Sequence, residues 1–124
     1  MKWYLDWIFR EINEKLTECD YELEGVEDEF GLARRYAQQG ARIKQERWHS
    51  IFEKQRKIDN KIYVFKLLKS TLYKYYSPFN SDKEKTFYRK IINEEILEKL
   101  AKTENFEGCA LVEQFMEKFE AEKK

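Results

Sequence analysis

The sequence predicts an all-α protein, folded as a single compact bundle of about five helices. Apolar residues recur at gaps of three and four along most of the chain, which is the spacing of one helix face. One proline and four glycines are too few turn residues for a β-sandwich or barrel. The 124 residues include 3 Trp, 8 Tyr and 9 Phe, which is enough for one core without disulfides or metal. We therefore expect one domain over residues 1–124.

The stretch that organises this fold is 61–76, KIYVFKLLKSTLYKYY. Ten of its sixteen positions are apolar or aromatic, and on a helical wheel they leave no wide polar arc. A helix that is apolar on nearly all sides must be surrounded by other helices. Asp59 and Asn60 can cap its start, and Pro78 stops it. We expect this stretch to be the buried central helix.

The N-terminal third predicts one helix and an acidic turn. Alternating gaps of three and four separate Leu5, Ile8, Ile12, Leu16, Cys19 and Leu23. This stripe predicts a helix from Trp3 to Cys19 or one turn beyond. The acidic segment 20–31 then predicts a solvated turn or a docking surface for a basic partner. A calcium loop is excluded because Gly31 stands where the bidentate twelfth residue, a Glu, would be.

Four more helical stretches complete the expected bundle. A short helix is predicted over 30–39, and an amphipathic helix with a basic outer face over 41–58, running into the central helix. The inward stripe of the second is formed by Ile43, Trp48, Ile51, Phe52, Gln55 and Ile58. Apolar spacing then predicts helices over 82–102 and 107–119, joined by a turn at 103–105.

Charge is segregated along the chain, although the formal net charge is zero. Residues 1–30 carry 3 basic and 10 acidic side chains, residues 31–92 carry 16 and 5, and residues 93–124 carry 5 and 9. The order acidic, basic, acidic matters more for partners than the total, because potentials decay within about 8 Å at physiological salt. Lys outnumbers Arg seventeen to seven, which is typical of AT-rich genomes, including those of phages and mobile elements.

Cysteine and histidine usage predicts neither a cofactor nor a metal site. Cys19 and Cys109 are ninety residues apart, outside any CxxC spacing, and there is one His. Two reduced thiols are typical of the cytosol. Asp6 and Arg10 interrupt the only candidate signal segment, so we expect a cytoplasmic protein with no membrane partner.

One residue pair resembles a catalytic motif. His49 follows Arg42 by seven residues, which resembles the Arg–His spacing of HEPN ribonucleases, a family of small helical bundles. The resemblance implies a pair acting on a phosphodiester across a dimer interface. It covers eight residues, and Ile43 stands where the family usually has a polar residue. We expect instead a surface His two helical turns from a surface Arg, and no enzyme activity.

The predicted function is a non-enzymatic protein-interaction module. It would be a regulator or inhibitor that occludes a surface of a larger, nucleic-acid-handling protein, as small phage or mobile-element proteins do. Aromatic and Arg side chains are enriched in interface cores, and acidic ones dock basic partners. The expected contacts are Trp3, Trp7, Asp20, Glu22, Glu24, Glu27, Arg42 and Arg47.

The alternative is direct nucleic-acid binding by the basic region 34–74. Cations combined with aromatic rings are what single-strand binders use. The expected phosphate contacts are Arg42, Arg47, Arg56, Lys57 and Lys61. A third interpretation has the acidic segment cover the basic helix, within the molecule or within a homo-oligomer. A homodimer fits an aromatic-rich chain with exposed Trp residues.

Overall fold

The computed structural model describes residues 2–75 and 85–121, and the side chains of 4–75 and 86–120. The described part is helical with no strand, which confirms the all-α class. The described residues form four helices where about five were expected. The expected stop at Pro78 and the end of the central stretch at Tyr76 lie outside the described residues.

Helix α1 (Lys2–Gln38) is a single helix of 37 residues, about 55 Å long at 1.5 Å per residue. The prediction of an acidic turn between two shorter helices is therefore wrong. The reason is a seam that continues through the acidic segment, formed by Cys19, Leu23, Val26, Phe30 and Ala33, all packed in one cluster with α2 residues. Burial of this seam outweighs Gly25 and Gly31, each of which costs about 1 kcal/mol inside a helix.

Gly40 ends α1 by adopting a φ of 90°. The Ala41 N–H donates to the Tyr36 carbonyl (3.0 Å), and the Gly40 N–H donates to that of Ala37 (3.1 Å). These two bonds form a Schellman motif, for which glycine is the favoured residue because its φ is positive. The chain can then turn back toward α2.

Helix α2 (Gln45–Tyr73) joins the predicted 41–58 helix to the central stretch without a break. It begins four residues later than expected, and Asn60 and Asp59 lie inside it rather than capping a new start. The central position is confirmed: its last half contacts α1, α5 (Phe106–Ala121) and the π-helical segment η2 (Ile92–Leu97). Tyr63 and Tyr73 nevertheless face solvent, with 45% and 67% of their surface exposed.

One continuous helix is built from α3 (Lys85–Ile91), η2 and α4 (Glu98–Lys102). Its buried residues Tyr88, Ile92, Ile96 and Leu100 recur every four positions. An α-helical turn of 3.6 residues would rotate such a row off the core, whereas a wider π turn keeps it on one face. The predicted helices at 82–102 and 107–119 are confirmed over their described residues.

Asn105 fixes α5 against α2. Its side chain exchanges two hydrogen bonds with the Asn60 amide, at 3.0 and 2.7 Å. Its Oδ1 also accepts from the Gly108 N–H at 2.9 Å, which makes Asn105 the N-cap of α5. Gly108 is buried, and a Cβ there would lie 3.0 Å from Val64 Cγ2 and 2.9 Å from Asn105 Oδ1. The missing side chain lets the two helices approach closely.

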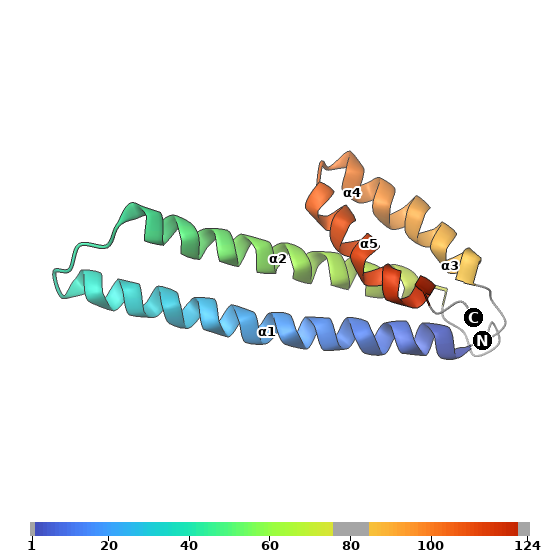
Figure 1. The fold of residues 1–124 in the computed structure, drawn as a ribbon, viewed down its shortest axis with the longest axis horizontal. Coiled ribbons are helices and arrows are strands. Elements are labelled where there is room, and N and C mark those ends of the chain that lie inside the picture. The colour runs from blue at the N-terminus through green and yellow to red at the C-terminus, as the bar shows by residue number, and fades with distance from the viewer. Residues whose placement is uncertain (1, 76–84, 122–124) are drawn as a thin grey trace.

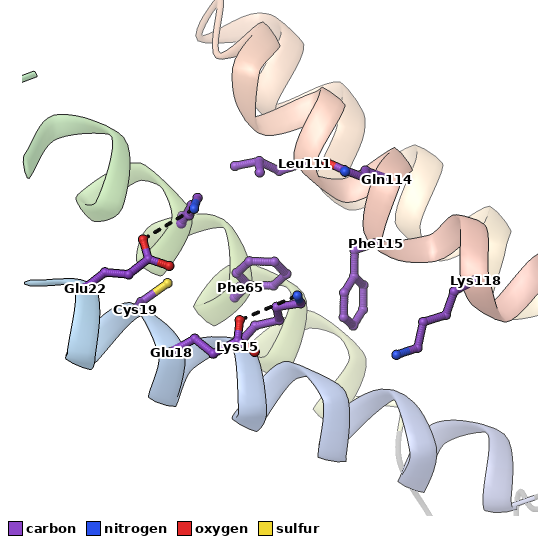
Figure 2. A pocket seen from close by; sticks show the side chains of 10 residues that line it. Lys15, Glu18, Cys19, Glu22, Phe65, Leu111, Gln114, Phe115 and Lys118 are labelled. Carbon is purple, nitrogen blue, oxygen red and sulfur yellow. Dashed lines mark ion pairs between the residues drawn. The ribbon is translucent and has the colours of Figure 1, made fainter. Parts of the chain in front are cut away.

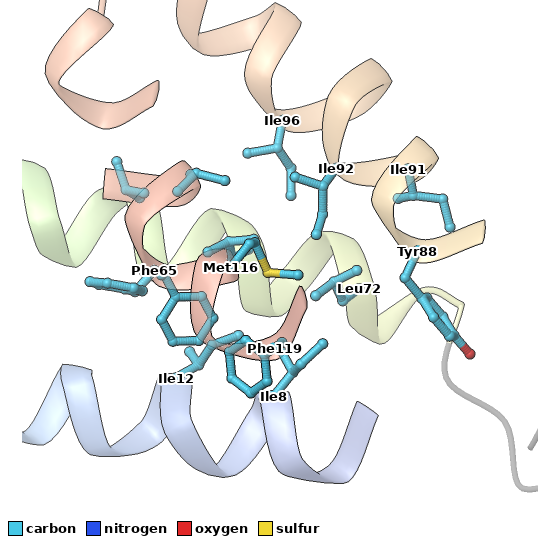
Figure 3. Close-up of a cluster of buried hydrophobic side chains, with 14 of the residues drawn as sticks. Ile8, Ile12, Phe65, Leu72, Tyr88, Ile91, Ile92, Ile96, Met116 and Phe119 are labelled. Carbon is cyan, nitrogen blue, oxygen red and sulfur yellow. The ribbon is translucent and has the colours of Figure 1, made fainter. Parts of the chain in front are cut away.

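The molecule has two halves with separate cores. In the bundle half, α3, η2, α4 and α5 pack on the first part of α1 and the last part of α2 (Figure 1). There Phe119 of α5 lies beside Ile8 and Ile12 of α1, and Met116 belongs to the same cluster (Figure 3). The stalk, residues 19–58, is the rest of the α1–α2 hairpin. It extends beyond the bundle, and its core contains Cys19, Val26, Ala33, Ile51 and Ile58.

Candidate interaction surfaces

The tip of the stalk, residues 30–52, carries a cluster of free cations. Five basic side chains are exposed there and make no hydrogen bond or ion pair with any residue that the structure describes: Arg34, Arg35, Arg42, Lys44 and Arg47. The only acidic residue of the tip is Glu46. Because the α1 end, the turn and the α2 start meet here, the fold concentrates charges that are spread over fourteen residues of sequence.

The cations further along α2 are mostly engaged within the molecule. Of the seven between Lys54 and Lys74, five have a partner. The bonds are Lys54–Glu29 at 3.2 Å, Arg56–Glu53 at 2.7 Å, Arg56–Glu107 at 3.2 Å, Lys61–Glu22 at 3.5 Å, Lys69–Asn13 at 2.8 Å and Lys74–Glu95 at 3.8 Å. Glu22 and Glu29 of the acidic segment thus cover part of the basic helix.

Aromatic rings accompany the free cations at the tip. Phe30 lies 5.6 Å from Trp48 and 6.0 Å from Phe52, measured between ring centroids. Trp48 and Phe52 stack at an interplanar angle of 22°. Phe52 remains 53% exposed and Tyr36 44% exposed. The sequence placed Phe52 on the inward stripe, but its ring lies at the margin of the two-helix seam and faces solvent.

A second surface, which we call the open face, runs along one side of the hairpin. Its residues are separated by three, four or seven positions, which keeps them on one side of a helix. On α1 they are Phe9, Asn13, Asp20, Glu24, Glu27, Gly31 and Arg34, and on α2 they are Phe52, Arg56, Asp59, Tyr63, Lys66 and Tyr73. The two rows share a side because the Phe9 and Tyr73 rings are 6.2 Å apart and Lys69 reaches Asn13.

The middle of the open face is acidic. Asp20, Glu24, Glu27 and Asp59 are exposed, and none forms an ion pair with another residue of the described ranges. The one cation among them, Arg56, is already bound to Glu53 and Glu107. This part of the surface therefore keeps an uncompensated negative charge.

A groove of about 400 Å³ lies between α1, α2 and α5, where the bundle gives way to the stalk (Figure 2). Cys19, Phe65, Leu111 and Phe115 contribute its apolar lining. Its three lysines are neutralised, by the pairs Lys15–Glu18 at 3.6 Å, Lys61–Glu22 at 3.5 Å and Lys118–Glu11 at 2.8 Å. Burial raises the pKa of the Cys19 thiol, which disfavours the reactive thiolate. The groove offers neither a free charge nor a nucleophile.

The residues predicted to contact a protein partner are distributed over several surfaces. Asp20, Glu24 and Glu27 lie on the open face, and Arg42 and Arg47 lie at the tip. Glu22 is paired with Lys61 on another side of α1. Trp7 is half-buried, and its ring meets that of Phe119 edge-on at 4.5 Å in the bundle core. The side chain of Trp3 lies outside the described residues.

The residues predicted to contact phosphates divide into two groups. Arg42, Arg47 and Lys57 are exposed and unpaired within the described chain, whereas Arg56 and Lys61 are bound to glutamates. Arg34, Arg35 and Lys44 lie in the predicted basic region 34–74 but were not among the expected phosphate contacts, and they join Arg42 and Arg47 at the tip. The positive φ at Gly40 brings them there, and a glycine between two basic runs was the signal in the sequence.

The Arg42–His49 pair is arranged differently from the expectation. Arg42 lies in the turn before α2, which begins at Gln45, so the two residues are not two turns apart on one helix. Both side chains are exposed. His49 has no hydrogen-bond or ion-pair partner among the residues described. No described residue therefore holds its ring by a hydrogen bond, as the orienting partner of a general base would.

The described residues contain neither a metal-ligand cluster nor a membrane-spanning helix. No group of three or more His, Cys, Asp or Glu side chains within residues 2–75 and 85–121 could hold a metal ion. Over the same ranges, no helix combines the length and apolar character needed to cross a membrane. Comparisons of the chain with protein-family models, with curated proteins and with solved structures each found no match.

Proposed function

We propose that the tip of the hairpin binds nucleic acid through its phosphates, the second of the two functions predicted from sequence. The observation that supports this is the set of five cations at the tip that have no ion pair or hydrogen bond with any described residue. A free guanidinium can bind phosphate and release counterions without first breaking an ion pair. Arg56 and Lys61, which would have to leave glutamates, are therefore not part of this site.

The test is binding to a labelled 20-nucleotide DNA or RNA, followed by fluorescence anisotropy at 50 and 200 mM salt. The variant R42Q/R47Q is expected to bind more weakly, because two phosphate contacts are lost. On duplex DNA the slope of log K against log salt should fall by about 2. K99Q/K102Q is the matched control, since both lysines are exposed in the bundle half and form no ion pair with a residue that the structure describes. No binding at 50 mM salt, or equal weakening by the control, would contradict the proposal.

The function predicted first, a non-enzymatic regulator or inhibitor that occludes a larger nucleic-acid-handling protein, is our second candidate. The observation favouring it is the acidic middle of the open face, with Asp20, Glu24, Glu27 and Asp59 unpaired among described residues. Proteins that handle nucleic acid carry basic surfaces, to which such a row is complementary. Cys19 and Cys109 are free thiols, which supports a reducing, cytoplasmic setting for either function.

Affinity capture from the source cell tests this candidate. The variant D20K/E24K/E27K reverses three charges of the open face. E98K/E104K/E117K reverses three exposed charges in the bundle half that form no ion pair with a described residue. We expect a partner to be retained by the wild type and the control and lost by the open-face variant. Identical captured proteins for all three would contradict the candidate function.

A further inference from the structure

We infer that the open face of the stalk binds a basic amphipathic α-helix of a partner protein. This inference rests on the second candidate function, for which it names the class of partner. It is independent of nucleic-acid binding at the tip, because its residues lie along the stalk rather than in the turn.

The apolar part of the site is a pair of exposed rings on α2. Phe52 and Tyr63 are 53% and 45% exposed, eleven residues apart, and on the same row of the helix. Three helical turns separate them, about 16 Å at 1.5 Å per residue. A partner helix lying along the stalk would present apolar side chains at the same interval. Two-helix hairpins bury only their own seam, which leaves such rings uncovered.

The acidic part lies alongside on α1. Glu22 pairs with Lys61 and Glu29 with Lys54, which sets the register of the two helices. In that register the segment 20–27 runs beside 56–63, between the two rings. Its carboxylates at positions 20, 24 and 27, with Asp59 from α2, face the same side. A helix with apolar residues on one side and Lys or Arg on the flank satisfies both rows at once.

The ends of the open face restrict the register of such a partner. Arg34 lies beyond the acidic row toward the tip, and Lys66 lies beyond it toward the bundle, so basic partner residues are favoured only in the middle. Gly31 is on the α1 row, and a Cβ there would have no atom within 4 Å. The internal packing does not require this glycine, and its small surface leaves room for a partner side chain.

Three synthetic 18-residue peptides serve as probes: an amphipathic Lys/Leu helix, its Glu/Leu counterpart, and a Lys/Leu sequence scrambled to remove the apolar face. Binding is measured by fluorescence anisotropy at 150 mM salt. The amphipathic Lys/Leu peptide is expected to bind the wild type and E98K/E104K/E117K. Its affinity should fall at least tenfold for D20K/E24K/E27K and for F52S/Y63S. Circular dichroism checks that each variant folds. We expect all of them to fold, because the substituted side chains are exposed.

Binding of the Glu/Leu or scrambled peptide as tightly as the amphipathic Lys/Leu peptide would overturn the inference. So would retention of affinity in both open-face variants. Light scattering tests whether a second copy of this chain occupies the open face. If the wild type is a dimer that D20K/E24K/E27K dissociates, this face is the dimer interface, and the inference is overturned. If capture from cells depends on the acidic row but the peptide does not bind, the helix inference is wrong and the regulator function stands. If neither capture from cells nor peptide binding depends on the acidic row, both the helix inference and the regulator function are wrong.

Discussion

The bundle half and the stalk are built from the same two helices but differ in what covers them. In the bundle half, α5 and the α3–α4 helix bury Ile8, Leu68, Met116 and Phe119 completely. The stalk has two helices, and its core is one seam that includes residues as small as Ala33 and Cys19. We conclude that the bundle half supplies most of the stability, whereas the stalk supplies most of the free surface.

The pairing of charge also differs between the bundle core and the tip of the stalk. Arg89 of the bundle half bonds Glu113 at 2.5 Å and Glu120 at 3.0 Å, and Lys118 bonds Glu11 at 2.8 Å. At the tip of the stalk, none of the five cations has such a partner within the described chain. Because α1 and α2 continue unbroken from one half to the other, the bundle holds the tip and the open face on a rigid support.

The largest expected effect tests the difference between the cores. Phe119→Ala removes a fully buried ring from the bundle half and should cost about 3 to 5 kcal/mol of unfolding free energy. Val26→Ala in the stalk removes two methyl groups and should cost roughly 1 to 2 kcal/mol. Urea unfolding followed by circular dichroism measures both. Equal costs would mean a larger cost per removed atom in the stalk and would contradict the view that the bundle half supplies most of the stability.

An alkaline titration examines the bundle core directly. Burial raises the pKa of Tyr4 to about 12, and the nearby Glu120 carboxylate adds to the effect. The unfolded chain therefore loses this proton first as the pH rises above 10. Stability from the neutral phenol is complete below pH 10 and is lost by pH 12, an effect of roughly 2 kcal/mol. Tyr4→Phe should flatten the decline of unfolding free energy over this window, and an unchanged decline would contradict the assignment.

Two glycines form a matched pair of intermediate effect. Gly108→Ala places a Cβ 3.0 Å from Val64 Cγ2 and should push α5 from α2, at a cost of about 1 to 3 kcal/mol. Gly25→Ala, in the stalk, meets no atom within 4 Å and should stabilise by about 0.5 to 1 kcal/mol, since alanine favours the helix. Melting temperatures measure both. The same sign for the two substitutions would contradict the close approach at Gly108.

The smallest effect concerns the ion pairs of the stalk. Lys54→Gln removes the bond to Glu29, which joins two half-exposed side chains at 3.2 Å. Such a pair contributes less than about 1 kcal/mol, and screening by salt reduces it further. Urea unfolding at 50 mM and 1 M salt should show a difference from wild type that shrinks with salt. A cost above 2 kcal/mol would mean that surface pairs, rather than the seam, hold the stalk together.

The sequence predicted the bundle half well and the stalk less well. Strong apolar stripes at 88–100 and 111–119 identified the last two helices, and the ring-rich stretch at 61–76 identified the central one. The acidic segment was misread because its seam residues, Val26 and Ala33, are small and lie among carboxylates and two glycines. Such a seam is a weak signal in sequence. It is nevertheless sufficient to keep the segment helical when α2 packs along it.

The sequence identified charged stretches but not which of their charges are paired. Arg42 and Arg47 were expected at a binding surface, and the structure leaves both exposed with no partner in the described chain. Arg56 and Lys61 were expected beside them but are bound to glutamates 51 and 39 residues away in sequence, Glu107 and Glu22. Periodicity places a residue on a helix face, but it does not show which residues of other helices lie opposite.

Composition and local spacing by themselves determined the helical class, most of the helix positions, and the segregation of charge along the chain, because these depend on residues within a turn or two of one another. The tertiary structure decided that the first 38 residues form one helix and that the acidic segment lies beside the basic one. It also decided which charges remain free. These outcomes depend on contacts between residues distant in sequence, where burial and ion pairing outweigh the local preference of each segment.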